Sequence, residues 1–202
     1  MSDELNEYDV LANAYEFLGA LLLKPVSQAP AIALDPQFWV AFTAFESEDV
    51  VAAAQSLVDF ADAKQGDEKA VEEVSVEFTR LFIGPPKPTV APWESFYCGA
   101  DVKNGFGPAT FAMQEVLREL GLKVSGENNQ YADHIGIELF ALAQMCRKVQ
   151  GGDDAAVKEF LEEHPLGWIG ALREAIAASE PDGYYVRVVA LAQALMEMQA
   201  AS

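Results

Sequence analysis

Hydrophobic residues recur every three to four positions along most of the chain, which predicts amphipathic helices. The first stripe ends at Pro25, as expected because a helix interior rarely tolerates proline. Later stripes begin or end at residues that typically cap helices, such as Ser47, Gly84, Pro108 and Gly121. The five clearest stripes are Tyr8, Leu11, Tyr15, Leu18 and Leu22; Val50, Ala54, Leu57 and Ala61; Val71, Val74, Phe78, Leu81 and Phe82; Met113, Val116, Leu117 and Leu120; and Tyr184, Val188, Leu191, Leu195 and Met198.

The remaining segments also favour helix. Asp35 and Pro36 predict the N-cap and first position of a short helix through Phe45, and Asp67 is expected to cap the helix that ends at Gly84. Residues 133–150 are apolar on more than one side, which is typical of a helix in the middle of a bundle. Shorter helices are expected over residues 153–163 and 166–178. Without convincing strands or repeats, the pattern predicts an all-α, single-domain bundle of about eight to nine helices over residues 1–202.

A long segment without helical pattern interrupts this series. It runs from Gly84 to Gly107 and carries four prolines and four aromatic residues. Loops longer than about 12–15 residues are uncommon in compact domains and usually have a function. Because proline restricts the unfolded backbone, the segment is expected to be a packed loop between two helical halves rather than a floppy linker. A simple crossover that covers one end of the bundle is the alternative interpretation.

Composition narrows the classes of partner. Hydrophobic residues make up 51% of the 202 residues and charged residues 22%, which is typical of a globular protein. The net charge of −19 disfavours nucleic acids and anionic membranes and favours cationic partners.

Cys98 and Cys146 are expected to be free thiols, although a single bridge between them stays an alternative. The N-terminus lacks the basic region of a signal peptide, and no run of about 18 apolar residues suggests a membrane span. A cytoplasmic protein without stable membrane insertion is therefore expected.

Asp133, His134 and Glu138 are the most conspicuous polar residues in the most apolar segment. Asp133 is expected to be the N-cap of the helix that follows. His134 and Glu138 lie four residues apart and share a helix face, so they form either a structural pair or a ligand contact. With two histidines and two cysteines and no tight ligand motif, no metal site and no cofactor are expected. His164 is expected to have a capping or packing role.

Four motifs follow one another along the chain: Phe78-x-x-Leu81-Phe82-x-Gly84; Ala91-Pro92-Trp93-Glu94-Ser95-x-Tyr97; Ala132-Asp133-His134-Ile135; and Phe160-Leu161-x-x-His164-x-x-x-Trp168. Together, in this order, they resemble the TorD/DmsD family, a group of twin-arginine redox-enzyme maturation chaperones in the NarJ-like superfamily. The order and spacing match over most of the chain. One difference is that the family often has Glu-Pro before Asp-His, where this chain has Tyr131 and Ala132.

The resemblance implies a cytoplasmic, non-enzymatic chaperone in protein folding. Such proteins bind the twin-arginine signal peptide or the apo form of a molybdenum-cofactor oxidoreductase, and they delay its export until the cofactor is inserted. The residues that match the family's peptide-binding positions are Leu81, Phe82, Pro92, Trp93, Ser95, Tyr97, Asp133 and His134.

The residues themselves favour the same kind of ligand. A signal peptide has a basic region followed by an apolar segment. Glu94, Asp133 or Glu138 could accept hydrogen bonds from a guanidinium group, and the aromatic residues of the loop could bind the apolar segment. The Pro-rich loop is thus expected to form one wall of a peptide groove and the start of the central helix the other.

Two other functions stay open at this point. One is a nucleotide-binding or slowly hydrolysing enzyme that uses Asp133 and His134, although no phosphate-binding motif is present. The other is a generic acidic helical adaptor for a basic partner. Neither the client nor the oligomeric state follows from the sequence, and the long loop is compatible with a homodimer or a domain-swapped form.

Overall fold

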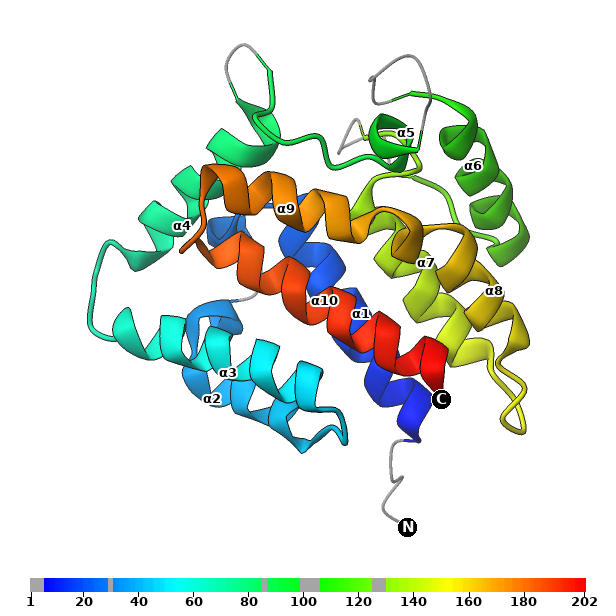
Figure 1. The fold of residues 1–202 in the computed structure, drawn as a ribbon, viewed down its shortest axis with the longest axis horizontal. Coiled ribbons are helices and arrows are strands. Elements are labelled where there is room, and N and C mark those ends of the chain that lie inside the picture. The colour runs from blue at the N-terminus through cyan, green and yellow to red at the C-terminus, as the bar shows by residue number, and fades with distance from the viewer. Residues whose placement is uncertain (1–5, 29–30, 85–86, 99–105, 125–129) are drawn as a thin grey trace. The chain divides into compact units, whose positions relative to one another are not determined.

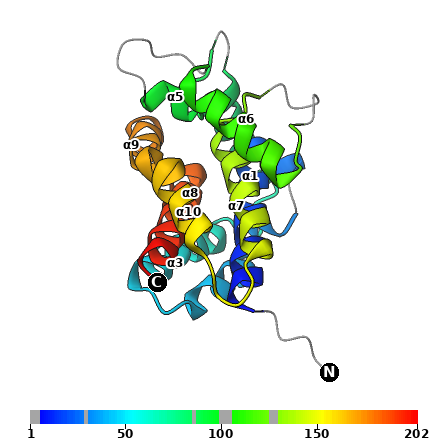
Figure 2. The ribbon, with the colours of Figure 1, turned by 90° about the vertical axis from the view of Figure 1, so that its right-hand side faces the viewer.

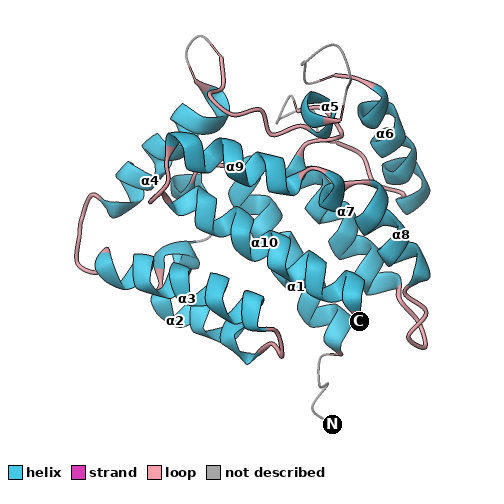
Figure 3. Ribbon diagram, viewed as in Figure 1, coloured by secondary structure: helices cyan, strands magenta, loops and turns pink. Residues whose placement is uncertain are grey.

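The protein is all-α, as predicted. The computed structural model describes residues 6–28, 31–84, 87–98, 106–124 and 130–202. These residues form helices and loops (Figure 3). Their only strand-like pairing is an isolated antiparallel bridge between Trp93 and His134. The α-helices are α1 (Glu7–Leu23), α2 (Pro36–Val40), α3 (Glu48–Ala63), α4 (Ala70–Phe78), α5 (Glu94–Tyr97), α6 (Pro108–Leu120), α7 (Ile135–Lys148), α8 (Ala155–Glu163), α9 (Ile169–Ser179) and α10 (Tyr184–Ala201) (Figure 1). Shorter turns comprise the 3-10 helices Val26–Gln28, Ala31–Leu34, Ala41–Ala44 and Pro165–Gly167 and a π-helical turn, Thr79–Ile83.

The chain divides into two compact units, and each unit combines two separate segments. Unit 1 comprises Met1–Leu23 and Pro92–Trp168, and unit 2 comprises Lys24–Ala91 and Ile169–Ser202. The Pro-rich segment therefore carries the chain from unit 2 into unit 1 between Ala91 and Pro92. That residues 1–202 form a single domain stays a prediction.

Unit 1 is organised around α7, which is buried on most of its surface, as its sequence predicts. Helices α1, α6 and α8 pack against it, and α1 lies along its length (Figure 2). Glycines allow the close approach of α1 and α7, because a Cβ atom at Gly19 would lie 2.8 Å from the Gly136 carbonyl oxygen. A Cβ atom at Gly136 would lie 2.6 Å from Leu23 Cγ. The backbone contact between the two helices therefore depends on both glycines.

Unit 2 is organised around α10, which packs against α3, α4 and α9. Trp39 and Tyr184 are fully buried there, with ring centroids 6.5 Å apart. Glu77 of α4 accepts hydrogen bonds from the backbone N–H groups of Tyr184 (3.0 Å) and Tyr185 (2.9 Å). A carboxylate distant in sequence thus satisfies two free donors at the start of α10, where Gly183 has no side chain to do so.

Several predicted helix boundaries are confirmed. The Asp35 carboxylate accepts the Gln37 N–H at 2.9 Å, and the Ser47 hydroxyl accepts the Val50 N–H at 3.4 Å. Pro108 begins α6, which ends at Gly121 in the left-handed conformation with φ 75°. These signals are local, since the cap and its partner lie within three residues of each other.

Other boundaries were predicted wrongly. Asp67 does not cap α4: its carboxylate accepts the Lys69 N–H within a turn, and α4 begins at Ala70. The helix expected through Phe45 is α only to Val40 and then tightens into a 3-10 turn. The helix expected from Asp133 to Gln150 extends from Ile135 to Lys148. The segment between Gly84 and Gly107 is not without secondary structure, because it contains α5.

Cys98 and Cys146 are not joined by a disulfide, as expected, and Cys98 is exposed while Cys146 is buried. Within the described ranges, no helix combines the length and apolar character needed to cross a membrane.

Candidate functional site

Eight of the ten predicted site residues lie in unit 1 and two in unit 2. The structure brings the segment around Trp93 and the start of α7 side by side in unit 1. Leu81 and Phe82 are instead buried in the core of unit 2, where the Phe82 ring lies 5.5 Å from that of Tyr185. The eight in unit 1 are Pro92, Trp93, Glu94, Ser95, Tyr97, Asp133, His134 and Glu138.

Backbone hydrogen bonds fix the Trp93 segment against the residues that lead into α7. The Glu94 N–H donates to the Asp133 carbonyl at 2.9 Å, and the Ile135 N–H donates to the Pro92 carbonyl at 3.0 Å. The Trp93 ring faces His134, with ring centroids 6.3 Å apart at an angle of 80°. The two segments are therefore adjacent, as expected for the two predicted walls of a groove.

The Asp133 carboxylate strengthens this junction from within. Asp133 is fully buried; its Oδ2 accepts the Ser95 N–H at 2.9 Å and its Oδ1 accepts the Thr110 hydroxyl at 2.9 Å. Ser95 lies in the first turn of α5 and Thr110 in the first turn of α6. Asp133 was expected to cap the helix that follows it, but it binds the start of two other helices instead. It is a positioning residue for the segment that carries Trp93.

His134 takes the capping role that was expected of Asp133. Its Nδ1 accepts the Gly136 N–H at 3.0 Å, so it is the N-cap of α7. Burial lowers the pKa of His134 to about 3, which keeps the ring neutral at physiological pH. With Nδ1 acting as acceptor, the proton of the neutral ring resides on Nε2. A neutral, buried cap is a poor general base.

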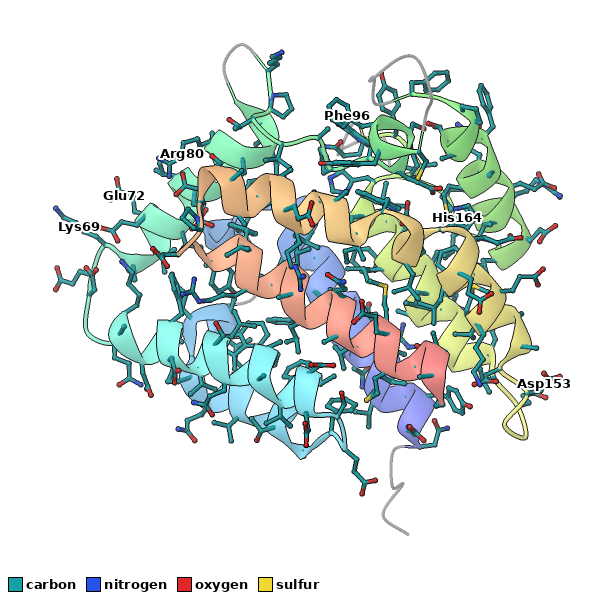
Figure 4. The ribbon with its side chains drawn as sticks, viewed as in Figure 1. Lys69, Glu72, Arg80, Phe96, Asp153 and His164 are labelled. Carbon is teal, nitrogen blue, oxygen red and sulfur yellow. The ribbon has the colours of Figure 1, made fainter. Side chains whose placement is uncertain are left out.

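Glu138 lies one turn further along α7 and is fully buried. Its Oε2 accepts a hydrogen bond from Trp168 Nε1 at 3.1 Å. Burial and the nearby Glu94 carboxylate raise the pKa of Glu138 well above its usual range, which favours its neutral form. Glu94 in turn lies 2.9 Å from His164 Nδ1 through its Oε2. These residues connect α5 and α7 with the end of α8, where Figure 4 labels His164.

The three predicted guanidinium ligands are therefore buried and bound to internal partners. Glu94, Asp133 and Glu138 hold the Trp93 segment, α6, α7 and the turn after α8 in register. Direct contact of these carboxylates with a client arginine stays a prediction.

Three exposed aromatic rings extend in a row from Trp93 on unit 1. We call Trp93, Phe106, Phe111 and Tyr131 the aromatic face. Ring centroids are 5.9 Å apart for Trp93 and Tyr131, 5.3 Å for Tyr131 and Phe106, and 5.2 Å for Phe106 and Phe111. Trp93 is half-buried, while Phe106 and Tyr131 are each 44% exposed and Phe111 is 58% exposed. Four connected rings with this exposure form an apolar surface that could bind a hydrophobic segment.

A groove continues from the aromatic face along the end of α6. It has a volume of about 470 Å³, and Tyr131 lies in its wall. Leu117, Leu122 and Val124 contribute apolar side chains to its lining. The aromatic face and this groove together exceed the size of a single side-chain pocket.

Sequence reasoning missed several contributors to the site. Thr110 and Trp168 hold the buried carboxylates, and His164 pairs with Glu94 rather than merely capping or packing. Phe111 and Tyr131 complete the aromatic face. A signal was available for Phe111, which lies outside the apolar stripe of its helix and must therefore face away from the core.

The described residues contain no group of three or more His, Cys, Asp or Glu side chains arranged to hold a metal ion. The buried carboxylates instead have hydroxyl, indole, imidazole and backbone groups as partners. The chemistry of the site is thus that of a rigid support for an exposed apolar surface.

Comparisons with known proteins agree on one family. A family model described as the nitrate reductase delta subunit matches residues 45–174. The chaperone protein TorD of Vibrio parahaemolyticus is 26% identical over 164 residues, which cover 77% of this chain and 76% of that protein. TorD of Vibrio atlanticus is 27% identical over 200 residues, covering 93% of this chain and 91% of that protein. TorD of Aliivibrio fischeri is 28% identical over 154 residues, covering 72% and 71%.

Proposed function

Because the chain belongs to the nitrate reductase delta subunit family, which also accounts for its likeness to the TorD chaperones, we propose that it is a maturation chaperone for a molybdenum-cofactor oxidoreductase. It acts in the cytoplasm, where it binds the twin-arginine signal peptide or the apo form of its client. Binding delays export until the cofactor is inserted. As a chaperone it binds its client and is not an enzyme.

The aromatic face is the observation that carries the proposal of peptide binding. A signal peptide contains an apolar segment of about 7–15 residues, which needs an apolar surface shielded from water. Tryptophan and tyrosine are frequent anchors of binding hot spots, and both are present here as Trp93 and Tyr131. The Asp133 network holds Trp93 in place before the client arrives, which lowers the entropy cost of binding.

The charge of the chain supports a basic client segment. The net charge of −19 attracts arginine residues over several ångströms and speeds their encounter with the surface. Added salt screens this attraction, so the association rate is expected to fall as salt is raised.

The structure gives little support to nucleotide hydrolysis. Asp133 and His134 are both buried and bonded to internal partners, and the low pKa of His134 leaves it a weak base. A generic adaptor for basic partners would share the acidic surface, but it gives no reason for an aromatic face next to a rigid Trp93.

Calorimetric titration with twin-arginine signal peptides tests the proposal. Peptides come from oxidoreductases for dimethyl sulfoxide, trimethylamine N-oxide, nitrate, selenate and formate, each beside a Lys-Lys variant. We expect binding by one peptide with a Kd near or below about 1 μM, weakened in its Lys-Lys form because lysine lacks the planar guanidinium fork. Failure of every peptide would remove signal-peptide binding from the proposal.

A matched pair of variants locates the binding surface. Phe111→Ala removes a ring that is 58% exposed in unit 1, and Val76→Ala removes an apolar side chain that is 54% exposed in unit 2. We expect only Phe111→Ala to weaken the peptide, by about tenfold, in the range for truncation of an aromatic contact. Equal effects of both variants would exclude the aromatic face as the docking surface.

A further inference from the structure

A second groove of unit 1 lies apart from the aromatic face. It is formed by α6, α7 and α8 and has a volume of about 360 Å³. We call it the acidic groove. Its lining residues are Val116, Glu119, Leu120, Met145, Ala156, Glu159, Phe160, Glu163 and His164.

The lining combines apolar and negative side chains and contains no lysine or arginine. Glu119 comes from α6, while Glu159 and Glu163 come from α8. All three glutamates are exposed, and in the described part of the chain none of them forms an ion pair. Such a groove suits an arginine side chain, because its aliphatic stem can lie on apolar surface while its guanidinium binds carboxylates.

The spacing of two of these carboxylates argues for an external cation. Glu159 and Glu163 are four residues apart on α8 and therefore lie on one helix face, where like charges destabilise a helix. The single lysine of α8, Lys158, forms an ion pair with Asp154 on the preceding turn rather than with these glutamates. A cation from outside the chain would remove the repulsion.

The groove is connected to the segment that carries the aromatic face. His164 lines the groove, and its Nδ1 lies 2.9 Å from Oε2 of Glu94, the residue after Trp93. In a signal peptide the basic region directly precedes the apolar segment. The acidic groove and the aromatic face of unit 1 thus present surfaces for the two chemically different parts of one peptide.

We infer that the acidic groove binds the arginine-bearing region of the client peptide, while the aromatic face binds its apolar segment. The inference rests on the proposed function and assigns the charged part of the ligand to Glu119, Glu159 and Glu163. It differs from the expectation that Glu94, Asp133 and Glu138 contact the arginines, because those three carboxylates are buried.

A double-mutant cycle by calorimetry tests this assignment. The groove variant is Glu119→Gln/Glu159→Gln/Glu163→Gln. The control variant, Glu46→Gln/Glu72→Gln/Glu162→Gln, changes the net charge by the same amount at exposed positions outside the groove. Each protein is titrated at one salt concentration with a twin-arginine peptide and with its twin-glutamine form.

For the twin-arginine peptide we expect the groove variant to lose about tenfold in affinity and the control variant less than about twofold. For the twin-glutamine peptide the three proteins should agree within about twofold, because the contact is then absent from all of them. Thermal unfolding confirms that the exposed substitutions leave the fold intact.

Three results would overturn the inference. Equal affinities of the groove and control variants for the twin-arginine peptide would show that only net charge matters, and would leave the proposed function in place. An equal loss with both peptides would show that the groove does not contact the arginines. No binding by the wild-type protein would reject signal-peptide recognition and this inference together.

Discussion

Replacement of Asp133 by alanine should destabilise the protein without removing any of its exposed surface. The carboxylate is fully buried and accepts hydrogen bonds from the Ser95 N–H and the Thr110 hydroxyl, both at 2.9 Å. Alanine leaves both donors buried without that acceptor. An orphaned buried donor costs about 1–3 kcal/mol.

The two donors do not contribute equally. The Ser95 N–H has a fixed direction and bears the full cost. The Thr110 hydroxyl can rotate towards Ser95 Oγ, which lies 3.3 Å away, and so recover part of its bond. We therefore expect Asp133→Ala to lower the free energy of unfolding by about 2–4 kcal/mol.

Asparagine is the matched control at this position. Its amide oxygen can accept the Ser95 N–H while its amide nitrogen donates to the Thr110 hydroxyl, which can act as an acceptor. We expect Asp133→Asn to cost about 1 kcal/mol or less, since both contacts persist without the negative charge.

Urea unfolding followed by circular dichroism measures both variants against the wild type. The midpoint should shift at an unchanged slope, because the surface exposed on unfolding stays the same. A loss below about 1 kcal/mol for Asp133→Ala, or equal losses for the two variants, would refute the argument from buried donors.

Three further predictions concern buried ionisable groups. Burial lowers the pKa of His134 to about 3, so its stability contribution is complete above the unfolded value of 6.5 and is lost as the pH falls towards 3. His134→Asn keeps a side-chain acceptor for the cap. Its free energy of unfolding should therefore change between these pH values by up to about 5 kcal/mol less than that of the wild type, and an unchanged pH dependence would contradict this. Because the pKa of Glu138 is raised, its stability contribution is complete below pH 4.5, the ordinary pKa of a glutamate, and is lost as the pH rises. The variant Glu138→Gln should therefore unfold at a higher urea concentration than the wild type at pH 8 but not at pH 4. A gain that is equal at both pH values would disprove this assignment. In unit 2, Glu77→Ala should lose about 2–4 kcal/mol in urea unfolding because two N–H groups at the start of α10 lose their acceptor, whereas Glu77→Gln should lose less; equal losses would argue against the capping role.

Local signals in the sequence predicted the helices well. The stripes of apolar residues and the caps at Asp35 and Ser47 depend on residues within one or two turns, which a sequence displays directly. Helix α7 was predicted to lie in the middle of the bundle because it has apolar residues on more than one side.

Long-range partners explain most of the errors. Asp133 resembles a local N-cap, but its donor at Ser95 lies 38 residues away, and no pattern in the sequence reveals that distance. The same bond supports α5, a single turn too short to show a period. His134 caps α7 instead, since its Nδ1 accepts the Gly136 N–H.

The Trp93 segment and the start of α7 are adjacent, as the sequence led us to expect, while the peptide-binding role of these residues stays a prediction. Pro92, Trp93, Asp133 and His134 do lie together in unit 1. The three carboxylates expected to bind a guanidinium group are buried and bonded to internal partners, which the sequence does not show because burial depends on packing. Their contact with a client arginine stays a prediction. Phe111 and Tyr131, which contribute to the exposed surface, were not predicted as binding residues, because a single aromatic residue gives no sign of its exposure in the sequence.

Site-specific photo-crosslinking with the whole client tests the central claim most directly. A photoreactive phenylalanine analogue replaces Phe111 in one protein and Val76 in another, two positions of similar exposure in different units. Each protein is irradiated with an apo-oxidoreductase that carries its twin-arginine signal peptide. The account predicts a crosslink from position 111 to the apolar segment of the signal peptide and none from position 76. A crosslink from position 76 alone, or from neither position while the complex is intact, would contradict the claim that the aromatic face binds the client.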